Sequence, residues 1–195
     1  MKVIRKHYGT IELGTSVILS DPCYEPDIWC SAEVKDMSPG IYDCYVDFAD
    51  MGAWGLRVTQ LTVVKENPPH EGPYRLMPVN ACLAVDAGMF GIYDAEYFRK
   101  VKDENPEAWY QQNVISWVAK EEGFICEEAK GFITSSGYGD GCYNGSCHLD
   151  DNGKVYKIEV PFIEPEEEDS KSLLIIKIVN NETSLSEIKK IIKVH

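Results

Sequence analysis

The 195-residue sequence predicts an α+β fold: mainly an antiparallel β sandwich or partly open barrel, with an inserted helical pair and a C-terminal βα appendage. Three observations lead to this prediction. Most apolar segments are short and mix aromatic with β-branched residues, which is typical of strands. Only residues 94–122 have helical periodicity before the tail. An acidic segment that begins with proline, residues 165–170, then separates this part of the chain from a tail, residues 171–195. The tail contains a short apolar segment followed by an amphipathic segment.

The first half of the chain is predicted to consist of short strands. A turn near Gly14 joins the first two, and prolines 22, 26 and 39 predict an irregular stretch from Asp21 to Gly40. A turn at residues 50–55 links an antiparallel pair, which a proline-rich loop at residues 67–73 follows. The predicted strands are residues 2–8, 16–20, 41–48, 56–65, 80–86 and 91–93.

Two helices are predicted after these strands. Asp94 is placed to cap a helix over residues 95–103. Asn105-Pro106-Glu107 is a restart signal, with an N-cap, a proline in the first turn and an acid. The second helix is expected to run to about Glu122 and to end at Gly123. The expected apolar faces are Tyr97, Phe98 and Val101, and then Trp109, Gln112, Val114, Ile115, Trp117 and Val118.

Four strands are predicted to complete the main domain. Asp150-Asp151-Asn152-Gly153 is predicted to be a hairpin turn, because Asn and Gly tolerate positive φ. A competing turn at Asn144-Gly145 would place Cys142 opposite Cys147; we prefer the later turn, which allows one longer strand before it. The predicted strands are residues 124–128, 131–135, 141–149 and 154–162.

The domain organisation follows from the acidic break. Residues 1–164 form the main β-rich domain, residues 165–170 an acidic linker, and residues 171–195 a small strand–helix appendage. The appendage is too small to fold alone, so it must pack on the main body or on another chain. Its helix, from about Ser184, is therefore also a candidate homo-oligomer contact. The apolar face of that helix is Leu185, Ile188, Ile191 and Ile192.

Composition limits the class of partner. The net charge of −13 argues against nucleic acid and against an anionic membrane surface, which both require clustered basic residues. The first residues lack a signal-peptide core and no run reaches the length of a membrane span, so a cytoplasmic location is expected. The seven scattered cysteines are expected to be reduced thiols packed as small hydrophobes.

Three segments set an acid beside turn-forming and aromatic residues: 21–24, 86–94 and 135–143, of which the last two are rich in glycine. Closely spaced glycines cost backbone entropy, so they are typical of positive φ or of close approach to the backbone. We expect the three segments to meet in one ligand site. The candidate ligand-binding residues are Asp21, Tyr24, Asp86, Gly88, Gly137, Tyr138, Gly139, Asp140 and Tyr143.

Each of these residues has a competing structural role. Asp140 could bind a cation, accept a proton or orient a hydroxyl, or it could cap its own turn. Asp94 has its role as a helix cap. Aromatic residues beside turns line ligand pockets or plug the ends of a β core. These aromatic residues are Tyr24, Trp29, Trp54, Tyr138 and Tyr143.

No established catalytic motif is present. The sequence lacks Gly-x-Ser-x-Gly, His-Glu-x-x-His, the dinucleotide fingerprint, the kinase elements and the Walker lysine. Cys23 would be a nucleophile only beside a base such as His70 or His148. Cys142, Cys147 and His148 lack the second close cysteine pair of a zinc site. The sequence therefore specifies no catalytic residue, metal or cofactor.

In this order, Ser20–Tyr24, Asp86–Asp94 and Ser136–Tyr143 resemble the motifs of a family of domains of unknown function from bacteria and their phages. The resemblance covers about residues 15–163 and omits the tail. It implies that residues of the three segments occupy motif positions, and the family's setting implies a role in conflict between bacteria or between phage and host. It implies no activity. The motif positions are Asp21, Asp86, Gly88, Gly91, Gly137, Gly139, Asp140 and Tyr143.

Three functions are consistent with these features. The leading hypothesis is a soluble, non-enzymatic binding protein that holds a small ligand or a peptide at the three-segment site. The second is a hydrolase in which Asp21, Asp86 and Asp140 hold a divalent cation and activate water. The third is an acidic inhibitor of a basic protein partner, whose binding would be sensitive to salt.

Overall fold

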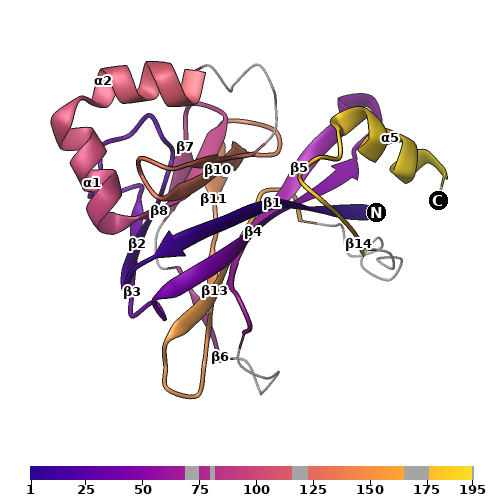
Figure 1. The fold of residues 1–195 in the computed structure, drawn as a ribbon. Helices are drawn as coiled ribbons and strands as arrows, with labels where there is room; N and C mark the ends of the chain where they lie inside the picture. Colours follow the sequence, from indigo (N-terminus) through magenta and orange to yellow (C-terminus); the bar gives the residue numbers. More distant parts are fainter. Residues whose placement is uncertain (69–74, 80–81, 116–122, 165–175, 195) are drawn as a thin grey trace.

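A computed structural model describes residues 1–68, 75–79, 82–115, 123–164 and 176–194 (Figure 1). Over these residues the chain has the predicted α+β fold, built mainly from antiparallel strands in three sheets. The sheets do not close into a barrel. Parts of four predicted segments lie outside the described residues: the 67–73 loop, the strands at 80–86 and 173–179, and the second helix. The acidic linker 165–170 lies wholly outside them.

The largest sheet crosses the whole molecule (Figure 1). In spatial order its strands are β14 (Ile176–Val179), β1 (Val3–Leu13), β4 (Gly40–Asp50), β5 (Leu56–Lys65), β13 (Val155–Pro161), β12 (Ser146–Leu149) and β6 (Arg75–Pro78). All neighbours are antiparallel except β14, which is parallel to β1. Alternate residues of β4 (Tyr42, Cys44 and Val46) are fully buried, as expected for a strand with one face on the core.

A second sheet of five strands shares that core. In spatial order its strands are β3 (Ala32–Lys35), β2 (Ser16–Ser20), β8 (Met89–Asp94), β10 (Gly131–Ser135) and β9 (Phe124–Cys126). Leu19, Phe90 and Phe132 on one face pack with the core of the large sheet, whereas Ile18 and Ile133 join a second cluster on the other face. Because both faces are covered, every residue of the central strand β8 is buried.

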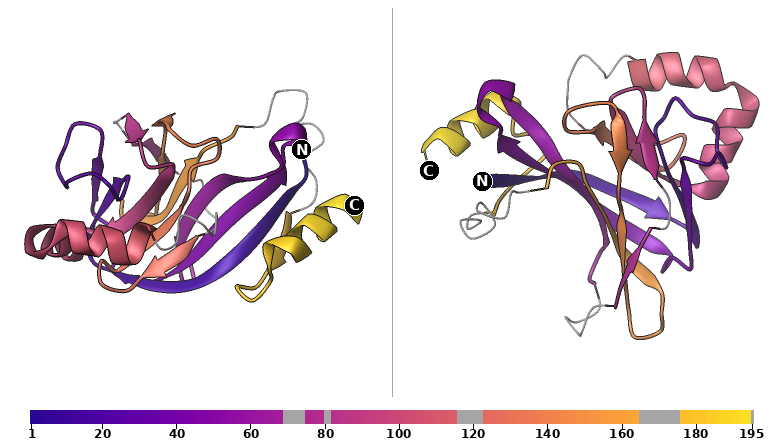
Figure 2. Two further views of the ribbon diagram at one scale, coloured as in Figure 1. Left: turned by 90° about the horizontal axis from the view of Figure 1, so that it is seen from above. Right: turned by 180° about the vertical axis from the view of Figure 1, so that it is seen from behind.

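The helical pair covers the outer face of the five-stranded sheet (Figures 1 and 2). α1 (Ala95–Glu104) is capped by Asp94, which accepts the Glu96 and Tyr97 backbone N–H groups. The predicted restart is confirmed: Asn105 accepts the Ala108 N–H and begins α2 (Pro106–Trp109). A π-helical segment, η2 (Tyr110–Ile115), continues it, and the remainder of the predicted helix lies outside the described residues.

The predicted apolar faces of the helices are confirmed only in part. Phe98, Trp109 and Val114 are buried and Val101 is half-buried, whereas Tyr97, Gln112 and Ile115 are exposed. Trp117 and Val118 lie outside the described residues.

The prediction of one long strand at 141–149 is wrong. The chain forms β11 (Gly141–Tyr143), which pairs with β7 (Leu83–Val85), and then crosses to β12 in the large sheet. The break falls at Asn144-Gly145, yet Cys142 does not face Cys147 because the two strands belong to different sheets. The later turn before β13 is confirmed, with Gly153 at φ +75° and Asp150 bonding the turn.

The expectation that all seven cysteines are free is also wrong. Pairing of Cys142 with Ala84 across β7 and β11 brings the Cys82 and Cys142 Cα atoms to 5.7 Å, and the two form a disulfide. The other five are free; four of these are buried, as expected of small hydrophobic side chains, and Cys23 is exposed.

The tail packs on the main body. β14 extends the large sheet, and α5 (Leu185–Val194) lies against β1 and β4, with Ile188 and Ile192 buried in the common core. The helix face proposed for self-association is therefore used within the chain. Figure 2 shows α5 and the α1–α2 pair at opposite ends of the molecule.

Three smaller features complete the fold. β1 runs to Leu13 rather than to residue 8, and β3 interrupts the predicted irregular stretch 21–40. A short 3-10 turn, η1 (Gly52–Trp54), forms the predicted turn between β4 and β5.

Among the described helices, none combines the length and the apolar character needed to cross a membrane.

Candidate functional site

Asp21 joins the first predicted segment to the second. It follows β2 and is fully buried, and its Oδ1 accepts the Cys23 N–H at 2.7 Å. Its Oδ2 accepts the Asp86 and Ala87 N–H groups at 2.8 and 2.7 Å. A buried carboxylate is stable when backbone N–H groups satisfy it. Asp21 therefore fixes the 86–88 loop and does not face a ligand.

The same loop contacts the third segment. The Gly88 N–H donates to Asp140 Oδ1 at 3.1 Å, and the Gly88 carbonyl accepts the Ser136 N–H at 3.1 Å. Gly88 has φ +63°, and a Cβ there would lie 3.9 Å from the Gly139 Cα. The three segments thus meet around residues 86–88, as predicted. Asp140 joins them through a backbone hydrogen bond rather than by capping its own turn.

Tyr143 holds the 136–140 turn from inside. Its hydroxyl lies 2.8 Å from the Ser136 carbonyl and 2.6 Å from the Gly139 carbonyl, and its single proton is shared between them. Burial raises the pKa of Tyr143, which keeps the hydroxyl protonated as a donor. The ring packs edge-on against Phe162 at 5.1 Å. Tyr143 therefore has a structural role in this turn.

Gly137 brings the turn against the large sheet. Its φ is +65°, and a Cβ there would lie 2.9 Å from Phe162 Cβ and 3.2 Å from the Val58 carbonyl oxygen. Only glycine fits this backbone conformation without strain and allows this close approach. The glycine signal in the sequence is explained at this position by packing.

Tyr24 and Asp86 form a separate hydrogen-bonded pair. The Tyr24 hydroxyl bonds the exposed Asp86 carboxylate, and this bond together with burial raises the pKa of Tyr24. Nearby, partial desolvation of the sulfur and a bond to Asp21 raise the pKa of the Cys23 thiol to about 12, although the residue as a whole is exposed. A thiol with that pKa is protonated at neutral pH and is a poor nucleophile.

The carboxylates do not form a metal-ligand set. Within the described residues, no group of three or more His, Cys, Asp or Glu side chains is placed to hold a metal ion. Asp21 is occupied by three backbone donors, and Asp140 turns to the Gly88 N–H. His148, one of the two bases suggested for Cys23, lies 2.7 Å from Glu159 instead. The geometry gives the hydrolase hypothesis no observation in its favour.

A cavity of about 260 Å³ lies against the two glycine loops, at residues 87–89 and 135–139. The end of β4, the start of β5, both loops and the first turns of α5 form its walls. Tyr138 is half-exposed at this wall, and its ring makes an edge contact with Trp54 at 5.7 Å. The lining residues are Phe48, Leu56, Arg57, Val58, Ala87, Gly88, Met89, Ser135, Gly137, Tyr138, Gly139, Leu185 and Lys189.

The cavity divides the predicted site residues into two groups. Gly88, Gly137, Tyr138 and Gly139 line it. The predicted residues that hold the loops without lining the cavity are Asp21, Tyr24, Asp86, Asp140 and Tyr143. The other two exposed aromatic residues of the prediction, Trp29 and Trp54, are also absent from the lining.

Sequence reasoning missed Arg57, Leu185 and Lys189. Arg57 lies in an ordinary strand pattern, and the two α5 residues belong to a tail that was expected to be an appendage. No local signal marks them, since only the packing of α5 on β4 and β1 brings the three together.

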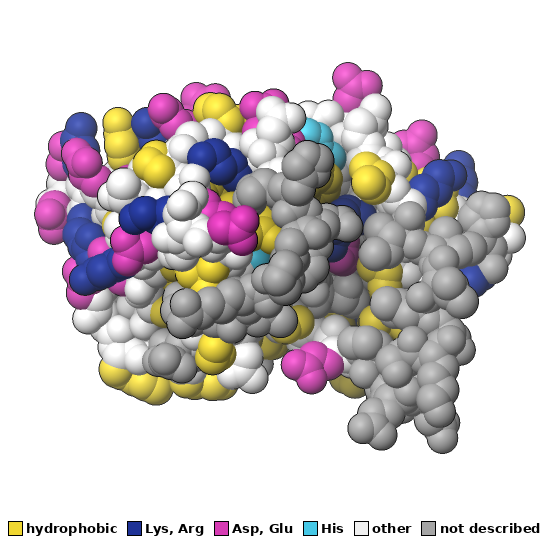
Figure 3. Space-filling view, turned by 90° about the horizontal axis from the view of Figure 1, so that it is seen from below, with side chains coloured by type: hydrophobic (Ala, Val, Ile, Leu, Met, Phe, Trp, Pro, Cys, Tyr) yellow, Lys and Arg dark blue, Asp and Glu magenta, His cyan; other side chains and the backbone are white. Residues whose placement is uncertain are grey.

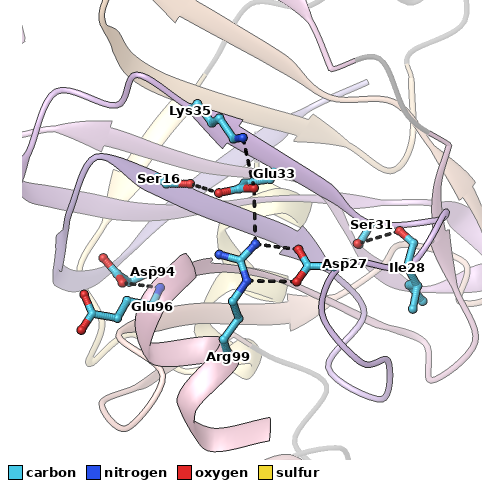
Figure 4. A network of polar contacts seen from close by, with 9 residues as sticks. All are labelled: Ser16, Asp27, Ile28, Ser31, Glu33, Lys35, Asp94, Glu96 and Arg99. Atoms are coloured by element: carbon cyan, nitrogen blue, oxygen red, sulfur yellow. Dashed lines mark hydrogen bonds and ion pairs between the residues drawn. The ribbon is translucent and has the colours of Figure 1, made fainter. Parts of the chain in front are cut away.

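Sequence reasoning also missed the two cations of α1 that hold the 21–31 loop. Arg99 of α1 bonds Asp27 at 2.6 and 3.0 Å and lies 3.3 Å from Glu33 of β3 (Figure 4). On the inner side, buried Lys102 donates to the Pro22 carbonyl at 2.9 Å. Burial lowers the pKa of Lys102, and its ammonium lies over the Phe98 and Trp109 rings. These two cations join the helical pair to the loop that carries Asp21.

Comparison of the chain with family models, with curated proteins and with solved structures gave no significant match. The resemblance to a bacterial and phage family therefore stays a prediction, as does the cytoplasmic location.

Proposed function

We propose that the protein is a binding protein that retains a small molecule in the cavity between the glycine loops and α5. The observation that carries the proposal is the composition of the wall. Backbone from two glycine segments lies beside apolar side chains and a half-exposed tyrosine, with two cationic side chains. Concave sites that place a few polar groups beside apolar side chains are typical of small-molecule binding.

The arrangement of the loops supports binding rather than catalysis. The groups nearest the loops that could act as nucleophile or base are engaged: Asp21 by backbone N–H groups, and Tyr143 by carbonyl oxygens. The Cys23 thiol has a raised pKa. A wall fixed in this way is pre-organised, which reduces the entropy cost of binding.

Native mass spectrometry of the gently purified full chain tests the proposal. We expect a mass above the denatured mass by that of one small molecule. Leu185→Trp, which enlarges a lining side chain, should remove the extra mass. Ile178→Trp, at an exposed position on β14, is the matched control and should retain it. No extra mass on the wild type, or the same extra mass on both variants, would contradict the proposal.

A further inference from the structure

The charge of the cavity wall is opposite to that of the chain. The protein carries 32 acidic and 19 basic residues, yet the described residues that line the cavity include Arg57 and Lys189 and no carboxylate. Elsewhere the two signs are mixed: on the face drawn in Figure 3, Lys and Arg side chains lie among Asp and Glu side chains. A cationic pair at a concave wall attracts an anion.

Arg57 is the stronger part of this observation. Its Nε is buried and has no hydrogen-bond partner among the described residues. In contrast, Arg5 bonds Asp47 through two nitrogens at 2.7 and 2.8 Å, and Arg99 bonds Asp27 in the same way. A buried guanidinium N–H without an acceptor is costly, so native proteins normally satisfy it. Arg57 also lines the cavity, so its guanidinium is the candidate partner for an oxyanion there.

The two cations differ in what they can recognise. The planar guanidinium of Arg57 presents paired donors that match the two oxygens of a carboxylate or a phosphate. Lys189 is exposed on α5 and adds a point charge at the other side of the cavity. Neither makes an ion pair within the part of the chain that is described.

The rest of the wall favours a ring beside the anion. Tyr138 lines the cavity and is 53 % exposed, and Trp54, which contacts the Tyr138 ring from outside the lining, is 66 % exposed. Rings of this kind stack on planar ligands. The cavity volume of about 260 Å³ is slightly below the range of about 300–1,000 Å³ typical of ligand pockets, which limits the ligand to a small molecule.

From these contacts we infer that the cavity binds a small aromatic oxyanion, a carboxylate or a phosphate monoester that carries a planar ring. Arg57 bonds the oxyanion, Lys189 adds attraction, and Tyr138 contacts the ring. This assignment rests on the proposed function and names the ligand class of the same site.

Isothermal titration calorimetry of the full chain at low salt tests the assignment with three probes: benzoate, phenyl phosphate and neutral benzamide. We expect one of the anions to bind at least about tenfold more tightly than benzamide, which is the usual gain from a charge-assisted hydrogen bond. The tighter of the two anions distinguishes a carboxylate ligand from a phosphate ligand.

Four variants locate the binding. Arg57→Gln should weaken the anion about tenfold or more, and Arg57→Lys should recover only part of the loss because it lacks the paired donors. Lys189→Gln should weaken the anion severalfold at low salt and less at high salt. Lys190→Gln, the neighbouring exposed lysine of α5 outside the lining, should have no effect. Thermal unfolding of each variant checks that it is folded.

The outcomes separate this assignment from the proposed function. If benzamide binds as tightly as the anions, and Arg57→Gln has no effect while Leu185→Trp abolishes binding, the anion class is wrong and the cavity function stands. If neither anion binds, the assignment fails. The mass measurement described above then decides independently whether the proposed function fails with it.

Discussion

Two aspartates beside turns have different roles at the scale of single residues. Asp21 is fully buried and bonds three backbone N–H groups, whereas Asp140 is exposed and bonds one. Both residues are aspartates in predicted turns, so the sequence alone cannot tell which of them is buried. What separates them is burial, since a carboxylate without solvent must obtain its hydrogen bonds from the chain.

Gly137 gives a prediction at this scale. Gly137→Ala should lower the free energy of unfolding by about 2–4 kcal/mol, because it adds the strain of positive φ and a contact with Phe162 and Val58. Gly52→Ala is the matched control: its φ of +63° is similar, but nothing lies within 4 Å of its Cβ position, so we expect about 1 kcal/mol. Urea denaturation measures both. Equal losses would show that close packing at Gly137 is unimportant.

At the scale of elements, short strands with clear local patterns could be predicted and long-range partners could not. β5 and β10 have the predicted bounds, and Asp94 and Asn105 cap helices as expected. The division of 141–149 into β11 and β12 depends on partners far away in the sequence, β7 in one sheet and β6 in another. Strand propensity carries no information about partner choice, which tertiary packing decides.

The candidate site, like the strands, could be predicted from local patterns only in part. The sequence identified the three segments as candidates for one site, but it could not show that they meet, because the hydrogen bonds that join them link residues 52 to 66 positions apart. The cationic wall could not be predicted. Arg57 is one residue of a strand, and its importance comes from its place in the cavity wall, which only the folded structure reveals.

The ion pairs between α1 and the 21–31 loop give a pH prediction. The Arg99 bond lowers the pKa of Asp27, and bonds from Ser16 and then Arg99 lower the pKa of Glu33. Carboxyl groups with a lowered pKa in the folded state contribute stability above their unfolded pKa values of about 3.9 and 4.3. That contribution is lost as the pH falls below about 4. Arg99→Gln should therefore destabilise the protein at pH 7 and have less effect at pH 3.

The expected loss at pH 7 is about 1 kcal/mol or less, because Asp27 is more than half exposed and solvent screens the pair. Lys100→Gln serves as control, since its contact with Glu104 is longer, at 3.9 Å, and exposed. Denaturant unfolding at the two pH values measures the difference. A loss for Arg99→Gln that is as large at pH 3 as at pH 7 would contradict the electrostatic explanation.

At the scale of the whole molecule, the tail completes the candidate site. The sequence left open whether the strand–helix unit packs on the main body or on another chain. In the structure β14 joins β1, and α5 places Leu185 and Lys189 beside the loops of the central segments. Residues 48–58, 87–89, 135–139 and 185–189 come from distant parts of the chain, so the cavity exists only in the assembled fold.

Our central claim is that these four segments form one anion-binding cavity. The most direct test is to follow the backbone amide resonances of the full chain during titration with phenyl phosphate. We predict that resonances of residues 56–58, 87–89, 135–139 and 185–189 shift together and saturate at one ligand concentration. Shifts confined to the exposed lysines of α5, or an absence of shifts at residues 87–89 and 135–139, would contradict the claim.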